Sequence, residues 1–297
     1  MRVTHVLRGE EWLTGTAKHL QLYRELGWSP PAYAHFPLLM DDRGAKLSKR
    51  HGAVFVENYQ SAGYEPLAIL NFLTRLGGGG GFASRDDLQL FSVPELTEQF
   101  QLSSISRHRI VVDFAWLRAY NQKLLHSIPI SRLIPDVQAL VSELLGGTEA
   151  VSQLPPELNV LQPGYVEKVL SYCLPRIHTL KEIVEMEDLR FFWAVPQQNE
   201  AFLAKLDTFY EKRSEAAQII ENVSTRLWDI SEFTAKDVAK NLKQLATEQK
   251  LNFPNFMHFL RCALSSVTVG PPVGEMFELL GKEIVLHRLE KLKTMLQ

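Results

Sequence analysis

Segments in which apolar residues recur at helical spacing follow one another through the last two thirds of the chain. No convincing strand alternation appears beyond residue 85. The spacing predicts helices over 93–101, 106–120, 130–146, 163–172, 176–187, 199–224, 234–249, 254–267 and 275–296. Thr234 opens a variant of the capping box ahead of Val238 and Leu242. Apolar stripes of this kind are typical of a packed core, so most of the chain is predicted to be all-helical.

The first 30 residues carry a different pattern, which favours an α/β segment. Val3–Leu7 is predicted to be a strand that leads into a turn at Arg8 and Gly9. Residues 14–27 are predicted to be a helix, with Thr14 as N-cap and Gly27 just past its end. Ligands of open α/β sheets collect beyond the carboxyl ends of the strands. The turn is therefore placed for a small-molecule site.

The pentapeptide Lys46-Leu47-Ser48-Lys49-Arg50, flanked by Gly44 and Gly52, predicts a mobile cationic loop. Lysine ammonium groups suit a polyphosphate, because they neutralise its charge without demanding a planar partner. Such a loop can stabilise charge that develops only in a transition state. The alternative is an ordinary solvated surface loop.

Composition fits a soluble globular protein with room for two domains. Of 297 residues, 45% are hydrophobic and 22% are charged. No apolar run approaches the roughly 18–20 residues of a membrane span. The net charge of −2 argues against nucleic-acid binding unless positive charge gathers on one face. Cys173 and Cys262 lack metal-site spacing and are expected to be idle thiols, with no structural metal.

Two segments are predicted to be connectors. Gly77–Gly81 cannot continue a helix and is expected to be flexible, and it lacks the Lys-Ser/Thr that completes a P-loop. The polar stretch 146–162 is expected to be a linker.

The order of these motifs resembles the glutamyl-tRNA synthetases of class I. Residues 4–12 and 14–28 are similar to the second half of that family's catalytic domain, and Lys46–Arg50 resembles its KMSKS signature, with Leu47 for Met and Arg50 for the final Ser. Residues 117–121, 175–182 and 279–283 resemble later family segments. The resemblance covers almost the whole chain, except that nothing resembles the first half of the catalytic domain with its HIGH signature.

The resemblance implies roles for individual residues. Arg8 and Glu11 would bind glutamate, and Lys46 and Lys49 would be catalytic. Contacts to ATP would come from Glu11, Trp12, Lys46, Leu47, Ser48, Lys49 and Arg50. Contacts to the tRNA anticodon would come from Gly270, Pro271, Val273 and Arg176. ATP with Mg²⁺ enters as substrate, with no tightly bound cofactor.

The expected architecture is a partial Rossmann-type α/β catalytic segment followed by a mostly α-helical anticodon-binding region. Residues 1–85 would form the second half of the catalytic domain, 86–145 a helical connecting subdomain, 146–162 a linker and 163–297 the all-α anticodon-binding domain. A helical region of this kind is implied for bacterial and organellar members of the family.

The function implied is that of a glutamate–tRNA ligase, with glutamate, ATP and the tRNA for glutamate as partners, and the resemblance leaves the tRNA for glutamine open. A monomer without a membrane partner is expected. The mitochondrial matrix is the expected location, with the bacterial cytoplasm as alternative. Because the first half of the catalytic domain is not represented, we expect impaired activation of glutamate. The alternatives are a non-catalytic tRNA-binding fragment and a helical scaffold protein.

Overall fold

The computed structural model describes residues 2–47, 55–80, 88–147, 159–196, 199–210 and 212–297. The chain divides into two compact units, Met1–Ser127 and Ile128–Gln297. The division falls ahead of the expected linker 146–162, because helix α6 (Ile130–Leu144) packs on helices of the second unit. The four-part division expected from the sequence stays a prediction.

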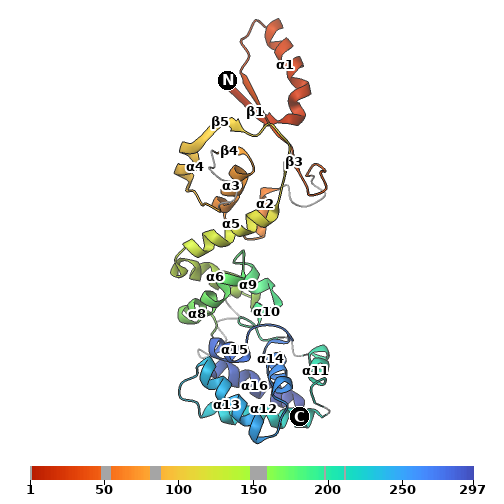
Figure 1. Ribbon diagram of the computed structural model, residues 1–297, viewed down its shortest axis with the longest axis vertical. Helices are drawn as coiled ribbons and strands as arrows, with labels where there is room; N and C mark the ends of the chain where they lie inside the picture. Colours follow the sequence, from red (N-terminus) through yellow and green to blue (C-terminus); the bar gives the residue numbers. More distant parts are fainter. Residues whose placement is uncertain (1, 48–54, 81–87, 148–158, 197–198, 211) are drawn as a thin grey trace. The chain divides into compact units, whose positions relative to one another are not determined.

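The first unit begins with a strand–helix–strand arrangement, drawn in red in Figure 1. Strand β1 (His5–Gly9) runs through the short 3-10 helix η1 (Glu10–Trp12) into α1 (Leu13–Glu25) and returns in β2 (Ala32–Phe36). The two strands are parallel, and Arg8 of β1 lies opposite His35 of β2. This is the expected α/β pattern, with both element starts within two residues of their predicted positions.

Apolar side chains in this strand–helix–strand arrangement are exposed. None of the residues of β1, η1 and α1, all of which the structure describes, is buried. Large exposed apolar side chains in this part of the chain are Val3, Leu7, Trp12, Leu13, Leu20, Leu22, Leu26 and Trp28. Parallel sheets are normally covered on both faces. This part of the chain therefore presents apolar surface to solvent.

The rest of the first unit has a small core of its own. Strand β3 (Leu39–Met40) pairs in parallel with β6 (Ile110–Val111), and α3 (Pro66–Arg75) packs on α5 (Phe114–Ser127). The buried cluster between them is formed by Ala68, Phe72, Val112, Leu117 and Tyr120. Helices α2 (Val56–Ser61) and α4 (Val93–Gln99) complete this part.

Two predictions about this unit are wrong. Residues Gly78–Gly80 form strand β4, which pairs antiparallel with β5 (Phe100–Ile105), so the described part of the glycine run is not a loose connector. The strands β5 and β6 also lie in the region predicted to contain only helices. Glycine favours close pairing here, because a Cβ on Gly79 would lie 2.7 Å from the ring of Phe100.

The regular elements in the described residues of the second unit are all helices. Its longer helices are α6, α8 (Pro163–Cys173), α12 (Arg213–Trp228), α13 (Ala235–Glu248), α14 (Phe253–Ser265), α15 (Val273–Leu280) and α16 (Lys282–Leu296). Its shorter ones are η4 (Leu174–Arg176), α9 (Glu182–Glu185), α10 (Glu187–Arg190) and α11 (Glu200–Leu206). The helix predicted over 199–224 is thus two helices, α11 and α12.

The core of the second unit is aromatic and aliphatic. Helix α12 packs along α16, and α13 packs on α15. Phe192, Trp193, Phe256, Phe259 and Phe277 are fully buried. The two cysteines, Cys173 and Cys262, are free and buried, and burial raises the pKa of the Cys173 thiol to about 12. Among the described residues, no helix is both long enough and apolar enough to cross a membrane.

Candidate functional site

Arg8 lies near the carboxyl end of β1, where the parallel strand pair opens toward solvent. Its guanidinium donates from Nε to His35 Nε2 at 3.2 Å and from Nη2 to the Thr16 hydroxyl at 2.8 Å. Its Nη1 lies 3.2 Å from His19 Nδ1. The guanidinium carbon stands 5.1 Å from the Tyr33 ring centroid, within cation–π range. One arginine is thus held by α1 and β2 together.

Glu11 and Lys46, which are distant in sequence, meet in the structure. Lys46 Nζ lies 3.6 Å from Glu11 Oε1, and both side chains are about half exposed. Gly9 makes room for this carboxylate, because a Cβ at Gly9 would stand 2.1 Å from Glu11 Oε2. A half-exposed pair contributes little stability. Its consequence is positional, since it joins the start of the cationic loop to the turn after β1.

Backbone hydrogen bonds fix the start of the cationic loop. Met40 and Lys46 form an antiparallel bridge, and the Leu47 amide donates to Leu39 O at 2.9 Å. Leu47 packs on the buried cluster of the first unit. Ser48, Lys49 and Arg50, predicted to contact ATP, lie outside the described residues.

Trp12 completes the group of predicted residues in the first unit. Its ring centroid lies 5.9 Å from the guanidinium carbon of Arg8, and its side chain is 56% exposed. Arg8, Glu11, Trp12 and Lys46 therefore lie in one exposed region around the end of β1. This region combines a guanidinium, an ammonium, a carboxylate and an indole face, which suits an anionic ligand with an aromatic part.

An apolar cavity of about 250 Å³ lies beside Lys46. Its lining residues are Leu39, Lys46, Leu47, Val56, Tyr59, Ile69, Phe72, Leu73, Leu76, Val112, Phe114 and Leu117.

In the second unit, Arg176 is exposed and stacks on an aromatic ring. Its guanidinium carbon lies 3.8 Å from the Tyr172 ring centroid, and Nη1 donates to Tyr172 O at 2.6 Å. Burial raises the pKa of Tyr172. The charge of Arg176 lowers this pKa, and the charges of Glu275 and Asp188 raise it. Asp188 also lies beside Gly270, with 4.0 Å between its Cβ and the position of a Cβ on that glycine. Arg176 and Gly270 thus share a neighbourhood.

The loop between α14 and α15 is fixed by side chains of its own unit. Arg261 donates to the carbonyl oxygens of Pro271 at 3.2 Å and Thr268 at 3.3 Å. Lys205 donates to Ser266 O at 2.9 Å, where the serine has a φ of 61°. Val269, at the tip, is 81% exposed.

Two predicted anticodon residues are packed inward. Pro271 is buried, and the Val273 side chain is only 2% exposed in the first turn of α15. Their side chains cannot meet RNA bases in this arrangement, because protein atoms cover them. Of the predicted residues in this loop, Gly270 is the one that remains partly exposed.

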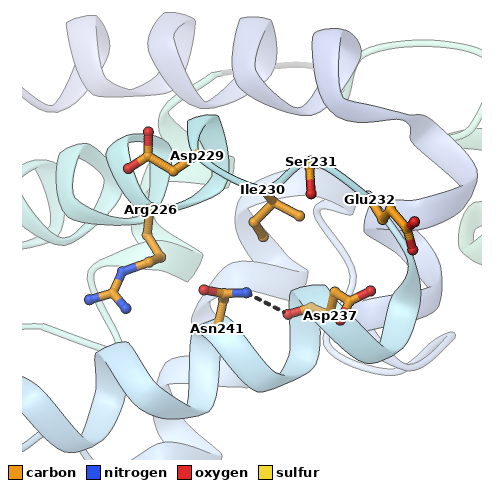
Figure 2. A pocket seen from close by; sticks show the side chains of 7 residues that line it. All are labelled: Arg226, Asp229, Ile230, Ser231, Glu232, Asp237 and Asn241. Atoms are coloured by element: carbon orange, nitrogen blue, oxygen red, sulfur yellow. Dashed lines mark hydrogen bonds between the residues drawn. The ribbon is translucent and has the colours of Figure 1, made fainter.

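A polar pocket of about 310 Å³ lies between α12 and α13, and Figure 2 shows its lining. Asp229, Glu232 and Asp237 contribute three carboxylates against the single guanidinium of Arg226. Asn241 donates to the Asp237 carbonyl oxygen at 2.9 Å. Phosphate groups would be repelled here, so this is not the surface of the unit that favours RNA.

Sequence reasoning missed four residues around Arg8, namely Thr16, His19, Tyr33 and His35. Thr16 and His19 stand three positions apart on one helix, a spacing that places them on one face. The part played by His35 depends on the strand register, which sequence alone does not provide.

These features define a class I synthetase segment, with a strand–helix–strand unit and a basic loop, joined to a helical anticodon-binding region. Residues 1–118 match the family of "tRNA synthetases class I (E and Q), catalytic domain", and residues 138–293 match "Anticodon binding domain". The chain belongs to this glutamate- and glutamine-type family of class I tRNA synthetases. The predicted fold class and family are thereby confirmed. The second match begins ahead of residue 163, where the anticodon-binding domain was expected to start.

Curated relatives are named glutamate–tRNA ligase. The chain is 32% identical over 294 residues to the protein of Chlorobaculum parvum, covering 98% of this chain and 56% of that one. It is 31% identical over 291 residues to that of Moorella thermoacetica, with the same coverage. The chain thus spans about 56% of the length of these relatives. Both are bacterial, and the expected mitochondrial location is not supported.

Solved structures share the fold. The crystal structure of a glutamate tRNA ligase from Elizabethkingia meningosepticum, in complex with its amino acid, matches with a TM-score of 0.70 and 24% identity. The match covers 100% of this chain and 58% of that one. A second structure, of the glutamate–tRNA synthetase from Elizabethkingia anophelis, matches with a TM-score of 0.66.

Proposed function

We propose that this chain functions as a glutamate–tRNA ligase, which activates glutamate with ATP and transfers it to tRNA. The observation that carries the proposal is the meeting of Arg8, Glu11, Trp12 and Lys46 at the end of β1. Their chemistry fits an amino acid with two carboxylates and a nucleotide with several phosphates. The named relatives, all glutamate–tRNA ligases, support the same substrates.

Each residue has a role in this proposal. Arg8 offers a planar guanidinium, which can donate two parallel hydrogen bonds to a carboxylate. Lys46, with Lys49 further along the loop, neutralises the charge of the ATP phosphates as pyrophosphate leaves. Glu11 bonds to the ligand's amine or ribose hydroxyls, and Trp12 covers a planar face. Mg²⁺ accompanies ATP as part of the substrate.

The helical second unit supplies the tRNA contacts. Arg176, stacked on Tyr172, can stack in turn on an unpaired base, and the loop around Gly270 lies in the same neighbourhood. The tRNA for glutamate is the proposed partner, with the tRNA for glutamine as a second candidate. We propose a monomer, acting with bacterial-type tRNA and away from membranes.

A non-catalytic tRNA-binding role is the second candidate. The observation that favours it is the contrast between a well-buried second unit and a strand–helix–strand segment without buried side chains. Such a chain would bind tRNA and form no adenylate.

Two measurements on the full chain separate these functions. Binding of labelled glutamate tRNA over a salt series, against a tRNA with an unrelated anticodon, tests recognition. ATP–pyrophosphate exchange with glutamate tests activation. Selective binding with weak exchange is the expected result, robust exchange would show that activation is not impaired, and non-selective, salt-sensitive binding would refute both functions.

A further inference from the structure

Arg8 carries a positive charge that is held entirely by neutral groups. Among the described residues, no carboxylate forms an ion pair with it. Its polar partners are Thr16 and two imidazoles, and its carbon stands over the rings of Tyr33 and Trp12. A half-buried guanidinium usually acquires an anionic partner, because isolated charge is costly to bury. Its orientation is therefore fixed while its charge stays available.

The hydrogen bonds determine the protonation of both histidines. A guanidinium only donates, and it stays charged throughout the accessible pH range. His35 Nε2 and His19 Nδ1 must then face Arg8 with a lone pair. His35 consequently carries its proton on Nδ1 and His19 on Nε2, and both rings are neutral.

The Thr16 hydroxyl fits the same arrangement. It accepts from Arg8 Nη2 and donates to the Trp12 carbonyl oxygen at 3.2 Å. Thr16 Oγ1 and His35 Nε2 lie 3.3 Å apart, so both accept hydrogen bonds from the same edge of the guanidinium. Of the five N–H groups of Arg8, one on each terminal nitrogen remains for a ligand.

We propose that Thr16, His19 and His35 are positioning residues, which as hydrogen-bond acceptors hold the Arg8 guanidinium for the amino-acid carboxylate. This inference rests on the proposed function, and it assigns to three further residues an effect on substrate binding that acts through Arg8. Loss of an acceptor would leave N–H groups of Arg8 without a partner, and the guanidinium could then turn away from the carboxylate.

The charged groups near Arg8 have other partners and do not take the place of these acceptors. Glu11 of η1 pairs with Lys46, and Glu10 pairs with Arg109 at 3.7 Å. Tyr33 on β2 presents its ring face and stacks beside His35, with 6.4 Å between centroids. Among the described residues, Thr16 and the two imidazoles are therefore the side chains that accept hydrogen bonds from Arg8.

The test follows the Nε–H signal of Arg8 by ¹⁵N NMR on the full chain, identified by its loss in Arg8→Lys. His35→Gln and His19→Asn place an amide oxygen close to the accepting nitrogen and do not titrate. His35→Leu and His19→Leu remove the acceptor. His5→Gln is the matched control, since His5 lies on the same strand and its Nδ1 lies 3.0 Å from the Thr4 hydroxyl. Glutamate is then titrated into each variant at pH 8.

At pH 8 we expect a protected Nε–H in the natural chain and in the His19→Asn/His35→Gln double variant, and its loss in His35→Leu. The leucine variants should weaken glutamate binding at pH 8 by roughly tenfold, the loss of one charge-assisted hydrogen bond. Unchanged protection and affinity in the leucine variants would overturn the proposal.

If the signal responds to the variants as expected but glutamate never shifts it, the holding arrangement stands and the ligand is wrong. That outcome counts against the proposed function, whereas unchanged protection counts against the positioning role. The two failures are thus distinguishable.

Discussion

Arg288 in α16 is a buried arginine that connects two other segments of the second unit. It is 4% exposed and donates from Nη1 to the carbonyl oxygens of Phe191 at 2.7 Å and Leu264 at 3.5 Å. Burial lowers the pKa of its guanidinium to about 10. Arg288 therefore joins the segment after α10 to the end of α14 through carbonyl groups rather than through an ion pair.

Replacing Arg288 with Ala should lower the free energy of unfolding by about 2–4 kcal/mol, because a cavity opens and buried carbonyls lose a donor. Arg288→Met should cost less, since it fills the space and removes a buried charge. Urea unfolding measures both, with the exposed Lys291→Ala as control. A loss in Arg288→Ala no larger than in the control would show that these contacts are unimportant.

Arg176 is the residue on which tRNA recognition is expected to depend most. Arg176→Ala should weaken the binding of glutamate tRNA by roughly 5- to 100-fold, because the exposed guanidinium on Tyr172 no longer offers a stacking surface. Arg176→Lys keeps the charge and should recover only part of the loss. Electrophoretic mobility shift measures binding, and Arg132→Ala on α6, equal in charge change and exposed, should have a small effect. Equal losses in Arg176→Ala and Arg132→Ala would indicate charge attraction alone.

At the scale of elements, the β4–β5 pair depends on glycine at two successive positions. Gly79 has a φ of 94°, and a Cβ there would stand 2.7 Å from the Phe100 ring. At Gly78 a Cβ would stand 2.8 Å from Leu73 O, a backbone atom that cannot turn aside. The strand therefore approaches both its neighbours more closely than any other residue type allows.

Gly79→Ala should destabilise the first unit by about 2 kcal/mol, because a left-handed backbone is costly for alanine and the ring must move. Gly164→Ala, at the start of α8, is the control, since nothing lies within 4 Å of the position that a Cβ would take there. Alanine at this position should be neutral or stabilising by about 0.5 kcal/mol. Thermal unfolding compares the two, and similar midpoints would disprove the close-packing argument.

At the scale of the whole molecule, burial is distributed unevenly along the chain. Residues of β1, η1 and α1 bury no side chain, whereas α12 and α16 bury six each. Local stability follows buried apolar contacts. Amide hydrogen exchange should therefore be fast over residues 5–36 and slow over α12 and α16, as measured by mass spectrometry of peptides. Slow exchange over residues 5–36 would mean that something covers the exposed apolar surface in solution.

The sequence by itself determined the helical second unit, the α/β start and the family. Apolar periodicity is a local property, so α8, α13 and α14 follow from it, and the basic loop with Arg8–Trp12 is a local motif. A glycine run, by contrast, contains no side chain that indicates pairing, and β4 forms only because β5 lies beside it.

Only the tertiary structure decided which residues meet. The parallel register of β1 and β2 places His35 against Arg8, and the fold brings Glu11 to Lys46. Packing of α15 buries Val273 and leaves Val269 exposed. Strand register and side-chain burial arise from contacts between residues distant in sequence, whereas periodicity records only neighbours along the chain.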